Sequence, residues 1–470
     1  MRIGHHLRAV AIALTLAIPA FAQAPAERGW PQWRGPTGNG VAPNAKPPTE
    51  WDATRNIRWK AQVPGAGHAT PVIWGERIYL LTAAPVAEGG TAAQPPAKGG
   101  PRASDAHAGP TPQEAPPSGE RRDRRPTGPP RSETPDEALA FTVLSLNRAD
   151  GRTLWQRTVA QERPHEGAHP TATFASASPV TDGERVYAFF GSRGVYCLNL
   201  EGNIVWSRRF GMMRTRNSFG EGASPALYGD TLVITWDHEG DDFIVALDKR
   251  TGQERWRQSR DEPTTWSSPR IIEVGGKPQV ITAGTNQCVA YDLSTGEPVW
   301  RTGGLTANVI PSPVYQDGLV ILMSGFRGAA IKAIRLDRAR GELGAGHEAI
   351  AWTADEKTPY VPSPLLANGL LYYFDNNRPI LSCRDAKSGE LRFGPERVDG
   401  LENVYASPLA ANGHVYLVGR SGQTTVIREG PSYEVVAVNR LDDEFSASPA
   451  AVDGELYLRG RQTLYCIAAQ

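Results

Sequence analysis

Apolar residues along most of this chain occur in short runs separated by glycine, proline, asparagine and aspartate. The clearest unit is a Ser/Thr-Pro pair followed, about five residues later, by a glycine and a short run of β-branched and aromatic residues. It occurs eight times, at Thr70-Pro71, Ser178-Pro179, Ser224-Pro225, Ser268-Pro269, Ser312-Pro313, Ser363-Pro364, Ser407-Pro408 and Ser448-Pro449. Successive prolines lie 108, 46, 44, 44, 51, 44 and 41 residues apart. Most of these intervals are typical of four-stranded propeller blades, which repeat about every 40–50 residues.

A second motif, Ala-x-Asp-x-x-Thr-Gly-x-x-x-Trp, follows within the copies. It runs from Ala246 to Trp256 and from Ala290 to Trp300, and variants with similar spacing end at Trp155, Trp206 and Phe393. Aspartate or asparagine opens a turn by bonding its own backbone, and glycine supplies the positive φ of a hairpin loop. Each copy is therefore predicted to hold four strands, A to D, with the Ser/Thr-Pro pair before A and the tryptophan on D at the junction between blades.

The last copy ends after a run that matches strand C, at 465–467, so its strand D is missing. Residues 56–63 form a strand-like run that contains a tryptophan and precedes the first Thr-Pro pair. We predict that this run completes the last blade and removes the open edges of the ring. The predicted fold is all-β: a single eight-bladed β-propeller of four-stranded antiparallel blades over 56–470, preceded by an extended segment over 23–55.

The long first interval contains residues 85–138, which are rich in proline, glycine, alanine and charge. Such a composition lacks the apolar residues needed to offset the entropy of ordering. We predict a disordered loop inserted between strands B and C of blade one. Its arginine-rich stretch at 120–126 is either a solvated part of that loop or a docking segment for an acidic partner.

The repeated Ala-x-Asp-x-x-Thr-Gly-x-x-x-Trp unit resembles the tryptophan-docking repeat of pyrroloquinoline-quinone (PQQ) dehydrogenases and of the non-catalytic outer-membrane assembly lipoprotein BamB. The resemblance covers about 30–470 apart from the insertion. The runs at 30–36 and 165–171 are similar to exported PQQ-like propeller proteins, most of which have no assigned reaction. The chain departs from the quinoprotein alcohol dehydrogenases, because it has neither adjacent cysteines nor a Cys-x-x-Cys-His haem motif.

The formal net charge is zero, which gives no electrostatic basis for binding nucleic acid. Residues 1–22 are predicted to be a signal peptide, with Arg2 and Arg8, an apolar run at 9–18 and a small-x-small cleavage site after Ala22. The apolar run is too short to span a bilayer, and no cysteine lies near the cleavage site. We expect a monomeric periplasmic or secreted protein without a membrane span or lipid anchor.

Export permits disulfides, and the chain has four cysteines. Cys197, Cys383 and Cys466 occupy the repeat position that is alanine or serine in other copies, and all four cysteines lie in different blades. Cysteines in non-adjacent blades would be too far apart to pair. We therefore expect small buried residues, not disulfides.

The loops from D to the next A and from B to C emerge on one face of a propeller, around the central channel, and this face is the expected binding surface. Polar and aromatic residues concentrate there in blades two to four. The leading binding candidates are His165, Glu166, His169, Arg216, His238, Glu239 and Trp266, with Arg214, Asn217, Glu221, Glu262, Thr264 and Thr265 in the same loops. Asp375, Asn376, Asn377 and Arg327 are weaker candidates on that face.

Two metal hypotheses arise from these loops. His165, His169, His238 and Glu239 would suit zinc, manganese or iron. Asp237, Asp241 and Asp242 would suit calcium, as a quinone site requires. The alternative is that the polar residues are ordinary turn-capping groups.

The leading functional hypothesis is a non-catalytic scaffold that binds a protein, small-molecule or carbohydrate ligand through the channel-mouth loops. A PQQ- and calcium-dependent oxidoreductase acting on an alcohol or aldose sugar is the first alternative. A carbohydrate-binding module is the second.

Overall fold

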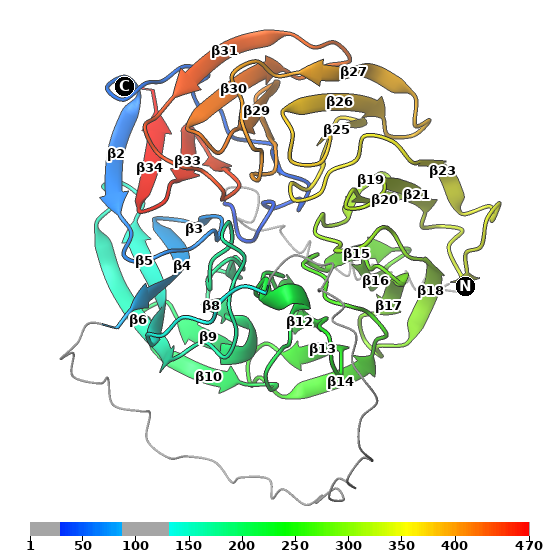
Figure 1. Cartoon of the computed structure of the whole chain (residues 1–470), viewed down its shortest axis with the longest axis horizontal. Coiled ribbons are helices and arrows are strands. Elements are labelled where there is room, and N and C mark those ends of the chain that lie inside the picture. The colour runs from blue at the N-terminus through cyan, green and yellow to red at the C-terminus, as the bar shows by residue number, and fades with distance from the viewer. Residues whose placement is uncertain (1–28, 87–130, 470) are drawn as a thin grey trace, which may run out of the picture.

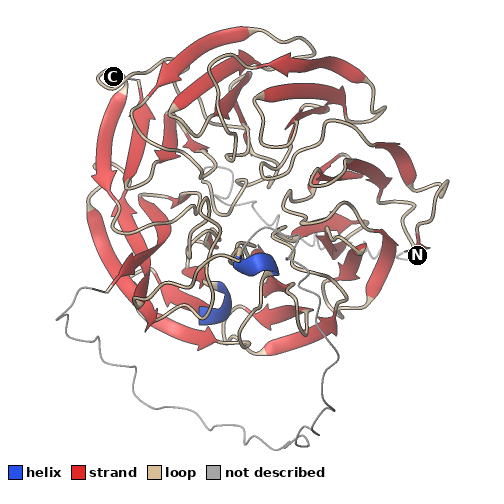
Figure 2. Ribbon diagram, viewed as in Figure 1, coloured by secondary structure: helices blue, strands red, loops and turns tan. Residues whose placement is uncertain are grey.

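The computed structural model describes residues 29–86 and 131–469, arranged as eight sheets around a central channel (Figure 1). The predicted signal peptide and most of the predicted insertion lie outside the described residues. Nearly all regular structure is β, as Figure 2 shows. The described helices are two three-residue 3-10 turns, η2 (Gly191–Arg193) and η3 (Arg216–Ser218). No helix within 29–86 or 131–469 is both long and apolar enough to cross a membrane.

Blades one to four each run from an inner strand to an outer strand in chain order. Their strands are β3 (Val72–Trp74), β4 (Arg77–Pro85), β5 (Leu139–Asn147) and β6 (Thr153–Glu162); β7 (Val180–Thr181), β8 (Arg185–Phe189), β9 (Val195–Asn199) and β10 (Ile204–Arg208); β11 (Ala226–Tyr228), β12 (Thr231–Trp236), β13 (Phe243–Asp248) and β14 (Glu254–Ser259); and β15 (Arg270–Val274), β16 (Lys277–Thr282), β17 (Gln287–Asp292) and β18 (Pro298–Gly303). Strands β4 and β5 of blade one pair from Arg77 opposite Asn147 to Pro85 opposite Leu139.

Blades five to seven follow the same order, and blade eight takes its outer strand from the N-terminal part of the chain; one short strand adds to blade four and another to blade seven. Their strands are β19 (Val314–Gln316), β20 (Leu319–Ser324), β21 (Ala330–Arg335) and β23 (Ile350–Ala354); β24 (Leu365–Ala367), β25 (Leu370–Phe374), β26 (Ile380–Asp385) and β27 (Leu391–Arg397); β28 (Leu409–Ala411), β29 (His414–Val418), β30 (Gln423–Arg428) and β31 (Val435–Arg440); and β32 (Ala450–Val452), β33 (Glu455–Arg459), β34 (Thr463–Ala468) and β2 (Ile57–Gln62). The short strands β22 (Gly341–Glu342) and β1 (Val41–Ala42) add in parallel to β18 and β28.

The N-terminal strand β2 closes the ring, as predicted. It pairs antiparallel with β34, from Ile57 opposite Ile467 to Gln62 opposite Thr463, and becomes the outer strand of blade eight. In Figure 1 the blue β2 lies beside the red β34 at the perimeter. The two ends of the propeller are thus joined by backbone hydrogen bonds.

The repeated Ser/Thr-Pro pairs form a belt around the channel. In seven of them the N–H of the hydroxyl residue donates to the Oγ of the next one, over 2.8–3.0 Å, from Thr70 to Ser178 and onward to Ser448. The Thr70 hydroxyl then donates to the main-chain oxygen of Ser448, 3.1 Å away, and completes the circle. Proline keeps each preceding residue extended, which suits this contact. The Ser/Thr-Pro pairs therefore link adjacent blades through hydrogen bonds.

Five strand-D tryptophans join their blade to the next, whereas the Nε1 of Trp300 in blade four has no partner among the described residues. Their Nε1 donates to a main-chain oxygen in the following C–D turn, from Trp59 to Arg148, Trp155 to Leu200, Trp206 to Lys249, Trp256 to Leu293 and Trp352 to Ala386, over 2.7–2.9 Å. The glycine of that turn lies under the ring, and a Cβ on Gly252 would be 2.6 Å from Trp206. The predicted role of these tryptophans at blade junctions is confirmed.

The buried core lies mainly between adjacent blades. One cluster joins Tyr79 and Leu81 of blade one to Val186 and Ala188 of blade two. All four cysteines are buried and unbonded, as expected from their position in the repeat. Burial raises the pKa of the Cys288 thiol to about 11.

Residues 30–42 run along the inner strands at the channel, and residues 47–51 continue over blade seven to its outer strand β31, a course that the sequence did not predict. Trp30 forms a bridge with Ile73 of blade one, and the main-chain oxygen of Pro31 accepts from the Thr181 N–H of blade two. Farther along, the Asn39 amide exchanges two hydrogen bonds, of 2.7 and 3.0 Å, with the main chain of Tyr315 in blade five. This segment divides the channel, with Trp33 lining the space on both sides of it.

Candidate functional site

A cavity of about 1090 Å³ occupies the channel mouth, including the part that opens to solvent. Its floor contains Trp33 and hydroxyl residues of the serine belt, and its wall consists of loop residues from several blades. Aromatic, imidazole and hydroxyl side chains dominate the lining: Trp33, His68, His169, Thr171, Ser176, Phe219, Ser224, Trp266, Ser268, Tyr360, Tyr405, Ser407, Ser446 and Ser448.

The aromatic wall is held by specific contacts. Trp266 Nε1 donates to the main-chain oxygen of Gly220, 2.7 Å away. The His169 ring meets Phe219 edge-on, with centroids 4.8 Å apart, and its Nδ1 lies 2.8 Å from Thr171 Oγ1. These loops thus hold their aromatic rings in fixed positions before any ligand binds.

Two more aromatic residues complete the wall from blades five to seven. Tyr360 stacks on Phe326, with centroids 4.7 Å apart. The Arg420 guanidinium lies over the Tyr405 ring, 5.2 Å from its centroid. Neither tyrosine was among the predicted site residues, although both precede a Ser-Pro pair in loops of the same class.

His68 is a cavity residue that the sequence analysis missed. It precedes Thr70-Pro71 in the loop into strand A of blade one. Loops of this class were expected to surround the channel, so the same reasoning could have identified His68. Burial, and secondarily the charges of Arg459 and Arg420, lower its pKa to about 4. The imidazole is therefore neutral at physiological pH and presents an uncharged polar group to the cavity.

Several predicted carboxylate candidates instead fasten one loop to the next. The Glu166 carboxylate accepts hydrogen bonds from the Thr215 N–H and hydroxyl, at 3.0 and 2.5 Å. Glu239 accepts from the Thr264 N–H and hydroxyl, at 3.1 and 2.9 Å. Burial raises the pKa of Glu166. These acids accept hydrogen bonds from backbone N–H groups of another loop. This agrees with the turn-capping alternative, except that the capped loop is a neighbouring one.

Glu262 is more buried than Glu166 and Glu239 and plays the same part. Its two carboxylate oxygens accept from the main-chain N–H groups of Asn286 and Gln287, at 2.9 and 2.6 Å. The residue is 5% exposed, and burial raises its pKa to about 7.

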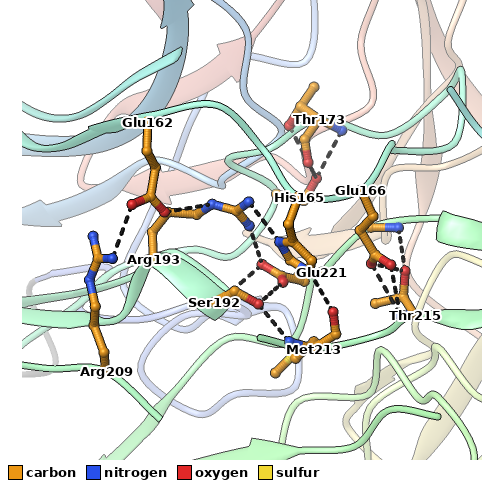
Figure 3. Close-up of polar contacts among 12 residues, drawn as sticks. Glu162, His165, Glu166, Thr173, Ser192, Arg193, Arg209, Met213, Thr215 and Glu221 are labelled. Carbon is orange, nitrogen blue, oxygen red and sulfur yellow. Dashed lines mark hydrogen bonds and ion pairs between the residues drawn. The ribbon is translucent and has the colours of Figure 1, made fainter. Parts of the chain in front are cut away.

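Arg193 is the centre of a second polar cluster, shown in Figure 3. Its buried guanidinium contacts Glu221 at 3.3 Å and Glu162 at 3.4 Å, and its Nη2 lies 3.1 Å from His165 Nδ1. The other ring nitrogen of His165 lies 2.5 Å from the main-chain oxygen of Met213. Both ring nitrogens of His165 thus contact protein atoms, and the residue, although exposed, does not line the mouth cavity.

Two of the three predicted calcium ligands, Asp237 and Asp242, have their carboxylates engaged in other contacts. Asp237 forms a buried ion pair with Arg260, with a shortest distance of 2.7 Å and both side chains 2% exposed. Asp242 accepts from the Glu262 N–H at 2.8 Å. Asp241 offers its main-chain oxygen to His238 Nε2, 3.2 Å away, and the other ring nitrogen accepts from the Arg214 N–H at 3.3 Å.

These contacts bear on both metal hypotheses. Within 29–86 and 131–469, no three histidine, cysteine or acidic side chains converge in a group that could hold a metal ion. The predicted zinc-type set is dispersed because only His169 of the four faces the mouth cavity.

Of the seven leading candidates, His169 and Trp266 line the mouth cavity. Arg216 is fixed by its main-chain N–H, which donates to Thr264 Oγ1 at 2.9 Å. The weaker candidates also make local contacts: Asp375 pairs with Arg378, Asn376 donates to Gly325, Asn377 accepts from Val361, and Arg327 lies over Phe326.

Comparison with known families places this propeller. A family model described as outer membrane protein assembly factor BamB matches three overlapping stretches, 48–239, 139–395 and 240–470. The chain belongs to this family. The BamB protein of Francisella salina is 32% identical over 101 residues, which is 21% of this chain and 18% of that protein. This chain therefore matches less than a fifth of the length of that relative.

Solved structures share the fold at low sequence identity. A europium-containing methanol dehydrogenase matches with a TM-score of 0.59 and 9% identity, over 92% of this chain and 89% of its own. A quinohemoprotein alcohol dehydrogenase from Pseudomonas putida matches with a TM-score of 0.53 and 10% identity, over 94% of this chain and 80% of its own. BamB from Moraxella catarrhalis matches with a TM-score of 0.50 and 12% identity, over 70% of this chain and 92% of its own. These likenesses show the fold alone.

Some structures with this fold are quinoproteins. Their cofactor PQQ carries several carboxylates, so a PQQ site in the mouth cavity would need charged partners. The described residues lining the cavity include no lysine or arginine. Their one acid, Glu221, already accepts hydrogen bonds from Ser192 and pairs with Arg193. An anionic quinone and its metal ion would thus find no cationic side chain and no free carboxylate in the described lining, although Arg420 lies behind Tyr405. The residues that line the mouth cavity therefore do not fit PQQ.

Proposed function

We propose that this protein is a binding scaffold that holds a polypeptide partner by taking an apolar or aromatic side chain of the partner into the mouth cavity. One observation carries the proposal: aromatic rings from separate loops and from the N-terminal segment converge on a single cavity. They are Trp33, Phe219, Trp266, Tyr360 and Tyr405. Buried aromatic side chains are frequent energetic centres of protein interfaces.

The fastening of the loops supports this role. Glu166 and Glu239 each hold a threonine of the following loop through two hydrogen bonds, so the mouth is assembled without a ligand. A site that is formed in advance loses less conformational entropy on binding. The family description, which names assembly of outer membrane proteins, is consistent with a protein ligand.

The location proposed for this scaffold is outside the cytoplasm. It rests on the basic, apolar and small-residue pattern of residues 1–22, which is typical of a signal peptide.

A peptide-binding assay tests the proposal. Fluorescence anisotropy against a library of ten-residue peptides should select sequences with tryptophan, phenylalanine or tyrosine. Trp266→Ala and Phe219→Ala should weaken the selected peptides at least tenfold, whereas Trp266→Phe should retain part of the affinity. Leu154→Ala is the matched control, because Leu154 is an apolar residue, 39% exposed, on the outer strand β6. Equal affinity for the wild type and both alanine variants would refute the proposal.

Carbohydrate binding is a second candidate, favoured by the serine hydroxyls and the neutral His68 beside the aromatic rings. Aromatic faces and hydroxyl groups together suit the apolar and polar faces of a sugar ring. A glycan array probed with the same variants separates the two: glycan binding that is lost in Trp266→Ala, without peptide binding, would favour the sugar.

A further inference from the structure

A second cavity lies on the other side of Trp33 from the mouth. It measures about 900 Å³, including the part open to solvent. The N-terminal segment forms one wall, and the inner strands of blades three to five form the other. The described lining contains two arginines and no acidic residue: Gln32, Trp33, Arg34, Pro36, Thr37, Gly38, Ser224, Pro225, Ala226, Leu227, Tyr228, Ser268, Pro269, Arg270, Ile271, Ser312 and Pro313.

Arg34 is almost fully buried in this wall, at 3% exposure. Its guanidinium donates to three main-chain oxygens, of Asn39, Pro364 and Pro408, over 2.7–2.8 Å. Its Nε has no partner among the described residues. The positive charge is therefore surrounded by neutral acceptors and lacks a carboxylate.

Arg270, on the inner strand β15, is the second cation of the cavity. It donates to the main-chain oxygen of Thr37, and its Nε also lacks a partner within the described chain. Burial lowers the pKa of Arg270 to about 10. Burial, followed by the charge of Arg270, lowers the pKa of Arg34 to about 9. Both groups remain protonated at neutral pH, so two like charges, the buried Arg34 and the half-buried Arg270, line one cavity.

Isolated buried charges are costly and are normally paired with an opposite charge. Two other buried arginines show both solutions: Arg260 is paired with Asp237, whereas Arg459 is held by the main-chain oxygens of Ala69 and Leu81. Arg34 and Arg270 differ from both because two cations line one cavity whose described lining holds no acid, and a bound anion would supply the missing charge.

We propose that this lower cavity is a binding site for a compact oxyanion, a phosphate, sulfate or carboxylate group, held by Arg34 and Arg270. Guanidinium groups bind such oxygens through paired, charge-assisted hydrogen bonds. The lining hydroxyls of Ser224, Ser268 and Ser312 accept the N–H groups of the belt, which leaves their hydrogens for a ligand.

This site is separable from the proposed function: Trp33, Ser224 and Ser268 line both cavities, but Arg34 and Arg270 line only the lower one, and Phe219 and Trp266 only the mouth. Failure of peptide binding in Trp266→Ala would leave anion binding unaffected, and the reverse holds for variants of Arg270.

Thermal unfolding and isothermal titration of the whole protein test the site. Inorganic phosphate, sulfate and citrate are each compared with sodium chloride at equal ionic strength. We expect at least one oxyanion to raise Tm and to bind with a stoichiometry of one, since a ligand of the native state stabilises it. The most effective probe distinguishes a phosphate or sulfate site from a carboxylate site. Equal effects of all salts, including chloride, would overturn the proposal.

Variants locate the binding. Arg270→Gln should weaken the effective anion at least tenfold, and Arg270→Lys should weaken it less. Arg77→Gln is the matched control, because Arg77 also donates to a main-chain oxygen of the next blade, that of Leu200 at 2.6 Å, but does not line the cavity. Unchanged affinity in Arg270→Gln would overturn the assignment.

If Arg270→Gln does not fold, crystals of the wild-type protein soaked in selenate decide the question. An anomalous peak between Arg34 and Arg270 would support the site, and peaks confined to other positions would refute it.

Discussion

Replacing Glu262 tests whether the acids of the mouth loops are structural fasteners. Glu262→Ala removes the acceptor for the N–H groups of Asn286 and Gln287, two exposed residues whose bonds to Glu262 are partly buried. Each such hydrogen bond contributes about 0.5–1.5 kcal/mol, so the free energy of unfolding should fall by about 1–3 kcal/mol. Urea denaturation followed by circular dichroism measures this difference. The exposed Glu297, in the C–D turn of the same blade, provides the control substitution Glu297→Ala.

The pH dependence sharpens this test. The pKa of Glu262 is raised from 4.5 to about 7 in the folded protein, so the folded state retains the proton that the unfolded chain releases. The Glu262 contribution to stability is therefore fully present below about pH 4.5 and is lost as the pH rises through about 7. At about 1.4 kcal/mol for each pH unit, the change approaches about 3 kcal/mol.

Glu262→Gln cannot titrate and should lack this dependence. The free energy of unfolding of the wild type should thus fall, relative to that of Glu262→Gln, as the pH rises from 4.5 to 8. A difference that stays constant with pH, together with an Ala variant within about 0.5 kcal/mol of wild type, would refute the fastening role.

Three further predictions concern the ring, the insertion and the quinone. Trp59→Ala should lower the free energy of unfolding by about 3 kcal/mol in urea denaturation, because the closing strand loses its packing and its bond to Arg148; a neutral effect would contradict the closure. Replacing 87–130 with a short Gly-Ser linker should change stability by less than about 1 kcal/mol, since Pro85 and Leu139 are already paired; severe destabilisation would contradict this. Adding PQQ with calcium should leave the quinone absorbance unchanged, whereas a stoichiometric complex would contradict the misfit.

The blade architecture could be predicted from sequence because its determinants are local and repeated. Each Ser/Thr-Pro pair, each Asp or Asn before a glycine turn and each strand-D tryptophan carries the same structural task in successive copies. The closing strand followed from counting, since the eighth strand D was missing after residue 467 and a matching run stood at 56–63. Pairing of β2 with β34 confirmed it.

The site was harder to predict because loop position does not determine what a side chain contacts. Glu166 and Asp237 lie on the predicted face, yet their partners, Thr215 and Arg260, come from other parts of the chain. The N-terminal segment has no repeat to compare with, so its course through the channel could not be predicted. Its cluster of Trp30, Trp33 and Arg34 was the available indication that it packs against the propeller.

Site-specific photocrosslinking tests the central claim most directly, namely that a polypeptide partner enters the mouth cavity. A benzoylphenylalanine residue is introduced at Phe219 in the cavity wall, or at Leu154 on the outer surface as a control, in cells that make the protein. We predict a discrete crosslinked protein from position 219 that is lost when Trp266→Ala is added. Crosslinks formed only from position 154, or unaffected by Trp266→Ala, would contradict the account.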